Sequence, residues 1–379
     1  MGMQFSVEEK RLIETAKTFR DEFVAPYADH WERDRRVPVE TLKLAADRGL
    51  LRLETPKQNG GHGVRFSVKM KLSEVLAETC MAFSFSMINT QNVAAKIAKE
   101  GSAKAVDRYV DDLMKGNIFG ATALTEPTAG SDFSRIKMQA RETDGGWMLN
   151  GEKAWITNAA IADVYVVFAQ TDAAKGWRGI ASFLVDSREK SFTRDPAFQM
   201  LGAHAIGAGG FALSDYYVPN WAVMAGPGEA FKRAMSSING ARTYVAAMCC
   251  GMVQSGLNTA VSYARERKTF GQSISNHQGL RWVLADIATE LQAARLLTEQ
   301  ASLLIDQGSS EAMLAAAHAK KYAARLAEKS IPQCIQILGA NGLREEYGLG
   351  RHLACAKEAH YVDGSTEIQN DRIAASLLD

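Results

Sequence analysis

Near the end of the chain, one carboxylate lies in a setting from which it could act as a base. Asp363 is followed by Gly364, and the two residues form a common turn dipeptide. Thr366, with Gln369 three residues later, has the spacing of a capping box that would open a last helix. The residues alone therefore favour a structural Asp, and a role in proton transfer depends on the rest of the chain.

A second polar segment, Ala123 to Asp132, reads Ala-Leu-Thr-Glu-Pro-Thr-Ala-Gly-Ser-Asp and is rich in hydroxyls, small residues and turn formers. Such a loop can bring backbone N–H groups and hydroxyls close to the oxygens of a ligand. An ordinary polar turn between strands has the same composition. The glycines of residues 60–63 lack the order of a dinucleotide or P-loop motif and are interpreted as a turn.

Composition excludes several classes of protein. The chain has 379 residues, is 46% hydrophobic, and carries 44 Lys and Arg against 43 Asp and Glu, which predicts a globular protein without a nucleic-acid surface. Its five cysteines and seven histidines show no metal-ligand spacing, so we expect no metal. We also expect a cytoplasmic location, because no membrane span of about 20 apolar residues and no signal peptide is present.

The start of the chain also matches a loose N-myristoylation pattern at Gly2. The pattern is so short that chance is the preferred explanation.

Helical spacing of apolar residues, as in Ile13, Ala16 and Phe19, predicts an N-terminal helical domain over residues 1–118. From residue 119 to 225 the pattern changes to short β-rich runs, of which 164–168 and 180–185 are the clearest, so we expect a middle β-domain. Asn150-Gly151 is the strongest hairpin signal within it.

Helical periodicity resumes in a third segment, residues 226–379, where Val283, Ile287, Leu291 and Ala294 recur at steps of three and four. Pro332 is expected to kink or end one of these helices. The fold class is therefore α+β, with helical, β and helical parts in that order and no sign of a linker between them.

Five ordered motifs, and the tail from Tyr361 to Gln369, carry a resemblance to a known family. The motifs are Thr125 to Asp132, Trp155-Ile156-Thr157, Arg265 to Gly271, His277-Gln278 and Gln336 to Gly342. Over essentially the whole chain the sequence resembles the FAD-dependent acyl-CoA dehydrogenase family. The resemblance implies that family's α+β fold, in which the C-terminal domain is a four-helix bundle.

The resemblance also implies that the chain binds FAD. One group of residues would hold the flavin ring and ribityl chain, and Trp155 would lie beside the ring. The matched positions of this group are Thr122, Leu124, Thr125, Gly130, Ser131, Trp155, Ile156 and Thr157. The remaining matched positions include several that approach the FAD of a neighbouring subunit in the family: Arg267, Lys268, Thr269, Phe270, His277, Gln278, Gln336, Leu338, Gly339, Ala340, Ser365, Thr366 and Glu367. A monomer could then not complete the site, and by family analogy we expect a homotetramer.

In the family, a glutamate at the position of Asp363 removes the α-proton of the acyl-CoA. Aspartate has one methylene fewer, which withdraws the carboxylate by about 1.5 Å. A misplacement of about 1 Å can lower the rate on the order of a hundredfold. Either the backbone or the substrate lies closer here, or the preferred substrate is not a straight-chain acyl-CoA.

Some relatives take the base from a helix preceding the Arg-Lys-Thr-Phe-Gly motif. The matching residues here include Asn239 and Ala241, neither of which can act as a base, so Asp363 is the candidate that remains. The substrate contacts implied by the resemblance are Ser131, Asn239, Arg242 and Gly364, with Arg242 near the pantetheine.

The acyl group is less clearly indicated. Residues 201–210 have His204 and small residues where the family carries polar contacts. Asn89, Thr90 and Gln91 could suit a functionalised acyl chain, although exposed positions on a helix are the preferred interpretation.

The leading hypothesis is dehydrogenation of a short, branched or alicyclic acyl-CoA, with hydride transfer to flavin N5 and an electron-transfer flavoprotein as the expected acceptor. Nitroalkane oxidases, which share the fold and use an aspartate, are the alternative enzyme. A flavoprotein without catalytic activity is the alternative from another class.

Overall fold

The structure, a computed structural model, describes residues 3–378, so Gly2 and its myristoylation pattern lie outside the described residues. The N-terminal part of the chain is helical, as the sequence predicted. Its α-helices are α1 (Val7–Phe19), α2 (Ala28–Asp34), α3 (Val39–Asp47), α4 (Phe66–Ala77), α5 (Met81–Glu100) and α6 (Ala103–Met114). Helix α1 begins with a capping box between Ser6 and Glu9, and it buries Ile13, Ala16 and Phe19.

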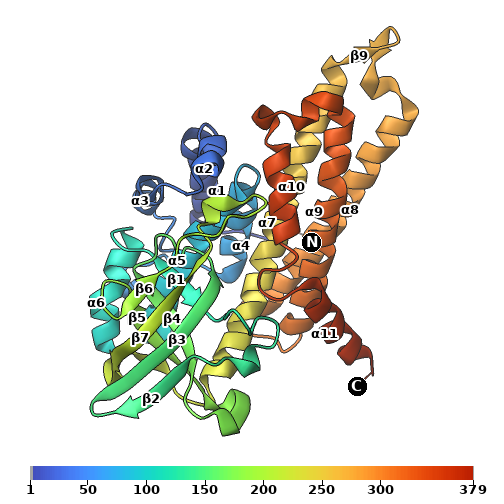
Figure 1. The fold of residues 1–379 in the computed structure, drawn as a ribbon. Coiled ribbons are helices and arrows are strands. Elements are labelled where there is room, and N and C mark those ends of the chain that lie inside the picture. Colours follow the sequence, from blue (N-terminus) through green and yellow to red (C-terminus); the bar gives the residue numbers. More distant parts are fainter. Residues whose placement is uncertain (1–2, 379) are drawn as a thin grey trace.

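The middle of the chain forms a β-domain, drawn in green at the lower left of Figure 1. Its strands are β1 (Gly120–Ala123), β2 (Gln139–Thr143), β3 (Gly146–Ile156), β4 (Val164–Gln170), β5 (Ile180–Asp186), β6 (Phe192–Arg194), β7 (Gly209–Pro219) and β8 (Val223–Ala225). The sheet order is β6-β7-β3-β2-β4-β5-β8, and β1 pairs with β4 in parallel. Strands β4 and β5 are buried along their whole length, which explains their continuous apolar sequences.

The hairpin prediction at Asn150-Gly151 was wrong. Strand β3 continues through both residues, with a register shift between Leu149 and Gly151 against β7. The turn into β3 lies instead at Gly145, whose φ is +73°. Asn150 is held across the strands, because its amide donates to Asp215 at 3.0 Å and its oxygen accepts the Asp215 N–H at 2.8 Å. Pairing of β3 with β7 thus prevailed over the local turn propensity of Asn150-Gly151, and these two residues form a β-bulge.

Long helices form the C-terminal part. They are α7 (Ala230–Glu266), α8 (Gln278–Asp306), α9 (Ala312–Leu338), α10 (Leu349–Glu358) and α11 (Thr366–Leu378). Of the two alternatives predicted for Pro332, the helix end is wrong, because α9 continues past the proline, while the kink stays a prediction. Ser330, Ile331 and Cys334 beside the proline are buried, so packing offsets the lost backbone hydrogen bond.

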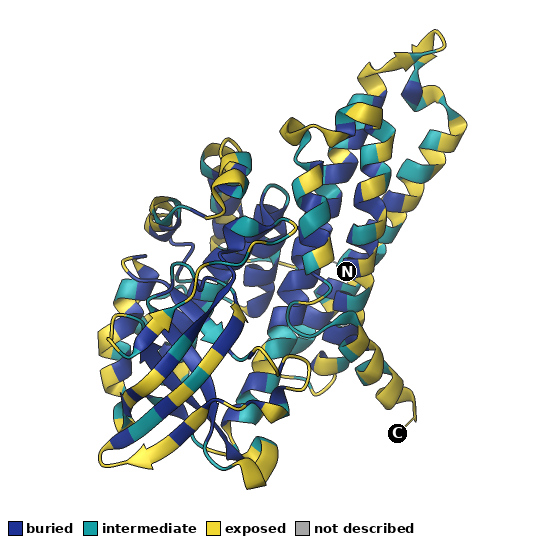
Figure 2. Ribbon diagram, in the orientation of Figure 1, coloured by how far each residue is buried: buried dark blue, intermediate teal, exposed yellow. Residues whose placement is uncertain are grey.

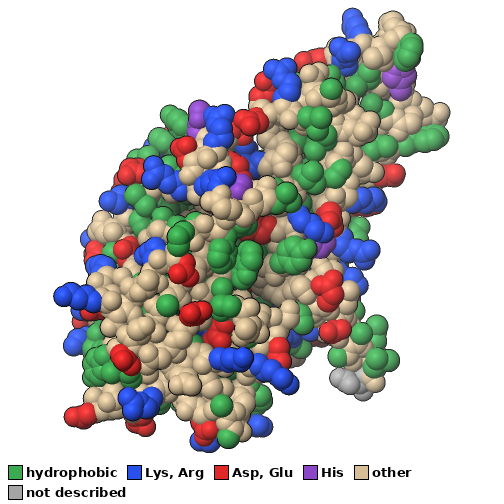
Figure 3. Space-filling view, viewed as in Figure 1, with side chains coloured by type: hydrophobic (Ala, Val, Ile, Leu, Met, Phe, Trp, Pro, Cys, Tyr) green, Lys and Arg blue, Asp and Glu red, His purple; other side chains and the backbone are tan. Residues whose placement is uncertain are grey.

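The arrangement in space has two hydrophobic cores. One joins the N-terminal helices to the C-terminal bundle, and the other lies within the β-domain and under α6 (Figure 2). Helix α7 runs from the β-domain into the bundle, and the short hairpin of β9 (Lys268–Thr269) and β10 (Gln272–Ser273) lies at the far tip (Figure 1). Charges of both signs are spread over the visible face, and hydrophobic side chains gather between the β-domain and the bundle (Figure 3).

Candidate active site

Asp363 lies in a tight turn between α10 and α11. Its φ is +55°, a left-handed conformation that is unfavourable for a residue with a side chain, and Gly364 follows with φ +96°. The turn is held from two sides. Lys320 on α9 donates to the carbonyls of Val362 and Gly364, and the Gln369 amide on α11 donates to the Gly364 carbonyl at 2.9 Å. Such a strained, externally held backbone is typical of functional sites.

Helix α7 contributes Arg242 to the same turn. Its Nε donates to the backbone carbonyl of Asp363 at 3.1 Å, and its Nη1 donates to the Asn239 side chain at 3.1 Å. A Cβ at Gly364 would lie 3.1 Å from Gln369 Nε2 and 3.3 Å from Arg242 Nη2. Gly364 therefore allows both side chains to approach the turn closely. The structure brings Asp363, Gly364, Arg242 and Asn239 together.

The electrostatics suit a base. Asp363 Oδ2 is shielded from solvent and has no hydrogen-bond partner among the described residues. Burial raises the pKa of Asp363, and the positive charges of Lys320 and Arg242 oppose this rise. Burial also lowers the pKa of Lys320 to about 8 and that of Arg242 to about 10. A carboxylate that is poorly solvated and has a raised pKa accepts a proton more readily than an exposed one.

The capping interpretation needs one correction. Ser365, not Thr366, accepts the N–H at the start of α11, at 3.4 Å from Ile368. Thr366 instead pairs through its hydroxyl with His360 Nδ1 at 2.7 Å, and Gln369 bonds to carbonyls rather than to an N–H. The reason is that the left-handed turn ends one residue earlier than a simple capping box requires. Glu367 is exposed on the first turn of α11.

The loop after β1 is the candidate flavin contact. Buried Lys153 of β3 donates to the Leu124 carbonyl and to Glu126 Oε1, both at 2.9 Å. Glu126 also accepts the N–H groups of Lys137 and Met138. The Ala154 N–H donates to the Thr125 carbonyl at 3.1 Å, which joins the loop to the last residues of β3. Thr122, Leu124 and Thr125 are half-buried, while Gly130 and Ser131 are exposed.

Trp155 lies at the end of β3, next to this loop. Strand register shifts between Lys153 and Ile156, and Trp155 itself has φ +59°. Trp155 is 62% exposed, and its ring forms an aromatic pair with Phe198, at 4.6 Å between centroids. Ile156 is buried, and the Thr157 carbonyl accepts from Asn89 at 3.1 Å. A bulge that turns a large aromatic ring outward beside an open polar loop fits a flat, polar cofactor such as a flavin.

The remaining residues that the resemblance implied as cofactor contacts lie elsewhere. The β9 hairpin carries Phe270, which is 98% exposed, and Thr269 Oγ1 lies 3.2 Å from His277 Nε2. The turn after α9 is tied to the same end of the bundle, because Asn341 donates to the Tyr263 hydroxyl at 2.9 Å. This tip is far from β3 in the fold (Figure 1). One chain therefore does not bring Arg267, Lys268, Thr269, Phe270, His277, Gln278, Gln336, Leu338, Gly339 and Ala340 to the Trp155 loop.

Two parts of the site were missed in the sequence. Lys320 supports the Asp363 turn, and its only sign in the sequence was a lysine within an alanine-rich stretch. The interpretation of Asn89, Thr90 and Gln91 as exposed was wrong. Thr90 and Gln91 are fully buried, and Asn89 is half-buried. Helix α5 lies between both cores, so it has no fully polar face, and periodicity alone could not reveal this.

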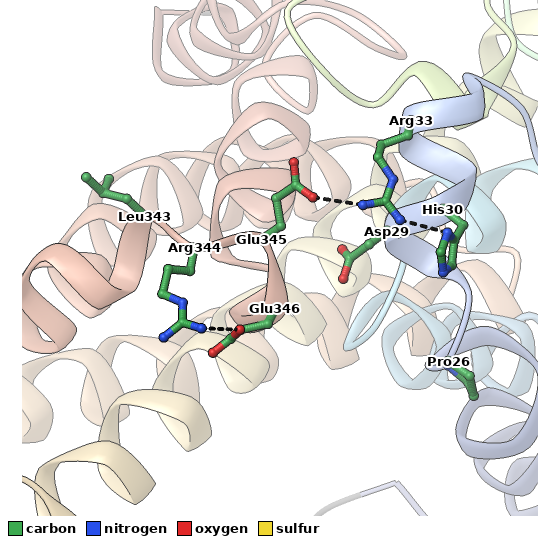
Figure 4. Close-up of a pocket in the computed structure, with 8 residues that line it drawn as sticks. All are labelled: Pro26, Asp29, His30, Arg33, Leu343, Arg344, Glu345 and Glu346. Carbon is green, nitrogen blue, oxygen red and sulfur yellow. Dashed lines mark hydrogen bonds and ion pairs between the residues drawn. The ribbon is translucent and has the colours of Figure 1, made fainter.

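A surface pocket between α2 and the turn after α9 is a different feature (Figure 4). Arg33 pairs with Glu345 at 3.1 Å and with His30 at 2.7 Å, while Arg344 pairs with Glu346 at 2.8 Å. These charges satisfy one another, and the pocket contains none of the predicted site residues. It does not belong to the site.

The helical, β and helical order and the carboxylate turn beside an open polar loop fit the class that the resemblance implies, a flavin-dependent dehydrogenase. Comparison with known families agrees. Three models match the chain: the acyl-CoA dehydrogenase N-terminal domain over residues 6–117, the middle domain over 121–216 and the C-terminal domain over 228–378. The chain belongs to the acyl-CoA dehydrogenase family. It is an FAD-dependent oxidoreductase that acts on CH–CH groups.

Individual relatives span the whole chain. The chain is 30% identical to a short-chain-specific acyl-CoA dehydrogenase of Clostridium acetobutylicum, with 100% of both sequences covered. It is 31% identical to a glutaryl-CoA dehydrogenase of Desulfococcus multivorans, covering 100% of this chain and 98% of the relative. The solved butyryl-CoA dehydrogenase of Megasphaera elsdenii superimposes with a TM-score of 0.95 at 28% identity, covering 100% of both chains. The predicted family, fold and cofactor are thus confirmed.

Neither a metal-binding cluster nor a membrane-spanning helix is present among the described residues, 3–378. They contain no group of three or more His, Cys, Asp or Glu side chains placed to hold a metal ion. No helix among them is long and apolar enough to cross a membrane.

Proposed function

We propose that the protein removes hydrogen from the α and β carbons of a short, branched or alicyclic acyl-CoA, with Asp363 as the base. The observation that carries this proposal is the Asp363 turn, which is strained, supported by three helices and equipped with an unpaired carboxylate oxygen. A purely structural turn residue would be expected to use its carboxylate in a hydrogen bond.

The chain's own groups divide the work of the reaction. Asp363 Oδ2 takes the α-proton as the thioester acquires enolate character. The Asp363 backbone N–H donates no hydrogen bond among the described residues, so it is free to stabilise the thioester oxygen. Arg242 and Lys320 hold the turn and offset part of the negative charge. FAD, when bound beside Trp155, supplies flavin N5 as the acceptor of the β-hydride.

The shorter aspartate is the reason to favour compact substrates. It places the carboxylate about 1.5 Å further back than glutamate would on the same backbone. The butyryl-CoA and short-chain enzymes among the relatives agree with a small acyl group. An α-carbon that approaches the turn closely would restore the transfer distance.

Anaerobic titration with butyryl-CoA, isobutyryl-CoA and cyclohexanecarboxyl-CoA tests the proposal. We expect one thioester to bleach the flavin band, and Asp363→Ala to slow this at least about a hundredfold. The matched control is Asp215→Ala, an exposed aspartate of β7 that also has positive φ. Bleaching that survives in Asp363→Ala would exclude Asp363 as the base. Bleaching by nitroalkanes and by no thioester would identify a nitroalkane oxidase instead.

We further propose that a homotetramer completes the flavin site and that an electron-transfer flavoprotein accepts the electrons. The position of the β9 hairpin supports the first part, because its exposed residues meet no flavin loop in their own chain. Rapid flavin reoxidation by an electron-transfer flavoprotein, with little reaction with oxygen, is the expected result for the second part.

A further inference from the structure

A buried polar cluster lies where α4, α5 and α7 meet. Lys69 on α4 forms an ion pair with Glu54, and it donates to Asn92 Oδ1 on α5 at 2.9 Å. The exposed fractions of the Lys69 and Glu54 side chains are only 6% and 15%. Gln91 adds a third contact, because its amide donates to Asn92 Oδ1 at 3.1 Å and its oxygen accepts the Glu54 N–H at 2.9 Å.

Tyr244 on α7 faces this cluster. Asn92 Nδ2 lies 3.5 Å from the Tyr244 hydroxyl, and Lys69 Nζ lies 5.6 Å from the centre of the tyrosine ring. Phe85 also packs against the Tyr244 ring, with 6.0 Å between the two ring centroids. The tyrosine is 6% exposed.

The cluster has unused donors. Both lone pairs of Asn92 Oδ1 are occupied, by Lys69 and Gln91. Among the described residues the Tyr244 hydroxyl donates no hydrogen bond, Lys69 uses two of its three N–H groups, and Asn92 has a second amide hydrogen. Buried donors normally find an acceptor. These donors therefore have no hydrogen-bond acceptor among the described residues.

The cluster is also close to the catalytic turn. Tyr244 follows Arg242 by two residues on α7, and Arg242 donates to the Asp363 carbonyl. Phe66 of α4 packs closely against Gly240 of α7, since a Cβ at Gly240 would lie only 3.1 Å from the Phe66 ring. Burial and the negative charge of Asp363 both raise the pKa of Tyr244. Tyr244 thus contacts the polar cluster and lies near enough to Asp363 to be affected by its charge.

We propose that the acyl chain of the substrate carries a neutral oxygen group, a hydroxyl or a ketone, that accepts hydrogen bonds from Tyr244, Asn92 and Lys69. This inference rests on the proposed function and names its substrate class more closely. Tyr244 and Asn92 are then specificity-determining residues. An unsubstituted chain would leave these donors without an acceptor, which a site built for hydrogen bonding penalises strongly.

The substrate group is inferred to be neutral because the charges of Lys69 and Glu54 already balance each other. The charge of Lys69 overcomes the effect of burial and lowers the pKa of Glu54, so the pair is ionised and balanced. A carboxylate on the substrate would meet Glu54 without an unpaired cation in the cluster to receive it. A glutaryl chain is therefore expected to bind poorly, unlike in the glutaryl-CoA dehydrogenase among the relatives.

The test compares acyl-CoAs with equal numbers of heavy atoms. The pairs are 4-hydroxybutyryl-CoA with pentanoyl-CoA, and 5-hydroxypentanoyl-CoA with hexanoyl-CoA, with glutaryl-CoA as the charged probe. In at least one pair we expect kcat/KM to be about tenfold or more higher for the hydroxylated chain. Equal values in both pairs, or a preference for glutaryl-CoA, would overturn the inference. If no thioester at all reduces the flavin, it is the proposed function that fails.

Variants separate recognition from a structural role. Tyr244→Phe removes one hydroxyl and should lower the hydroxyl preference several-fold, mainly through KM, while pentanoyl-CoA or hexanoyl-CoA turnover changes little. Asn92→Leu should reverse the preference toward the apolar chain. Tyr109→Phe, another buried tyrosine whose hydroxyl contacts Asp186 in the β-domain, is the matched control. A Tyr244→Phe enzyme that keeps its FAD and its full hydroxyl preference would contradict the assignment.

Discussion

The features of Asp363 that favour reactivity are also features that destabilise the folded protein. Its backbone is strained at φ +55°, and its buried Oδ2 has no hydrogen-bond partner within residues 3–378. A free surface aspartate would relieve both features. Lys320, Arg242 and Gln369 hold it in place instead, and such destabilising features are common where function requires them.

A pH-dependent stability follows for Asp363→Asn. The pKa of Asp363 is raised above its ordinary value of 3.8, so the folded state holds this proton more tightly than the unfolded state does. Ionisation of Asp363 therefore destabilises the fold as the pH rises through the raised pKa. The neutral asparagine avoids this effect. We expect the melting temperature of Asp363→Asn to exceed that of the wild type at pH 7, by about 2 °C.

The difference should narrow as the pH falls toward the ordinary value of 3.8, below which Asp363 is protonated in both the folded and the unfolded state. Differential scanning calorimetry of the FAD-loaded proteins between pH 4 and 8 measures it. A gap that is constant over this range, or that widens toward low pH, would contradict the raised pKa. The kcat/KM of the wild type should meanwhile rise with pH through the same pKa, since only the ionised base accepts a proton.

At the level of elements, the flavin loop depends on one buried ion pair. The side chains of Lys153 and Glu126 are 0% and 4% exposed, and Glu126 also holds the N–H groups of Lys137 and Met138. Burial lowers the pKa of Lys153 to about 8, while Glu126 opposes this. The pair therefore links the loop to β3 and to the start of β2 through a single carboxylate.

Lys153→Met should destabilise the protein by about 3–5 kcal/mol, because it leaves the Glu126 charge buried and unpaired. The double variant Lys153→Met/Glu126→Gln should be less destabilised than the single one, since the buried charge is gone. Thermal unfolding of the wild type and both variants gives the comparison, and FAD content after gel filtration reports on the loop. Equal stability of the single and double variants would mean that the pair contributes packing only.

At the level of the whole molecule, the two groups of proposed cofactor residues lie too far apart in one chain to contact the same FAD (Figure 1). The tip of the bundle presents Phe270, which is 98% exposed and meets the edge of the His277 ring at 6.5 Å between centroids, and Trp282, which is 62% exposed. Exposed aromatic residues that gather on one part of a surface mark a contact with another molecule. A second copy of the chain that brings this tip to the Trp155 loop would bury them.

Arg267→Ala/Phe270→Ala should therefore weaken FAD binding by about tenfold or more without unfolding the chain, because the hairpin packs against little of its own subunit. Flavin absorbance after dialysis measures FAD retention, and light scattering measures the mass. Val7→Ala, at a residue that is 86% exposed on α1, serves as the control. A wild-type monomer with full FAD occupancy would refute this arrangement.

The sequence by itself determined the family, the order of helical and β parts, and the residues of the motifs. These features are local: apolar periodicity encodes helices such as α1, and the five motifs keep their order whatever packs around them. Asp363 could be named as the candidate base for the same reason, since its neighbours in the chain carry the pattern.

Only the tertiary structure decided what surrounds those residues. Asn150-Gly151 became a bulge because β7 pairs with it, and α9 passes Pro332 because buried neighbours hold the helix. The residues that support Asp363 come from other helices, and one of them, Arg242, lies more than a hundred positions away in the sequence. Burial of Gln91 and its link to Lys69 through Asn92 likewise depend on which faces meet, because a polar residue carries no local sign of whether its partner is water or another helix.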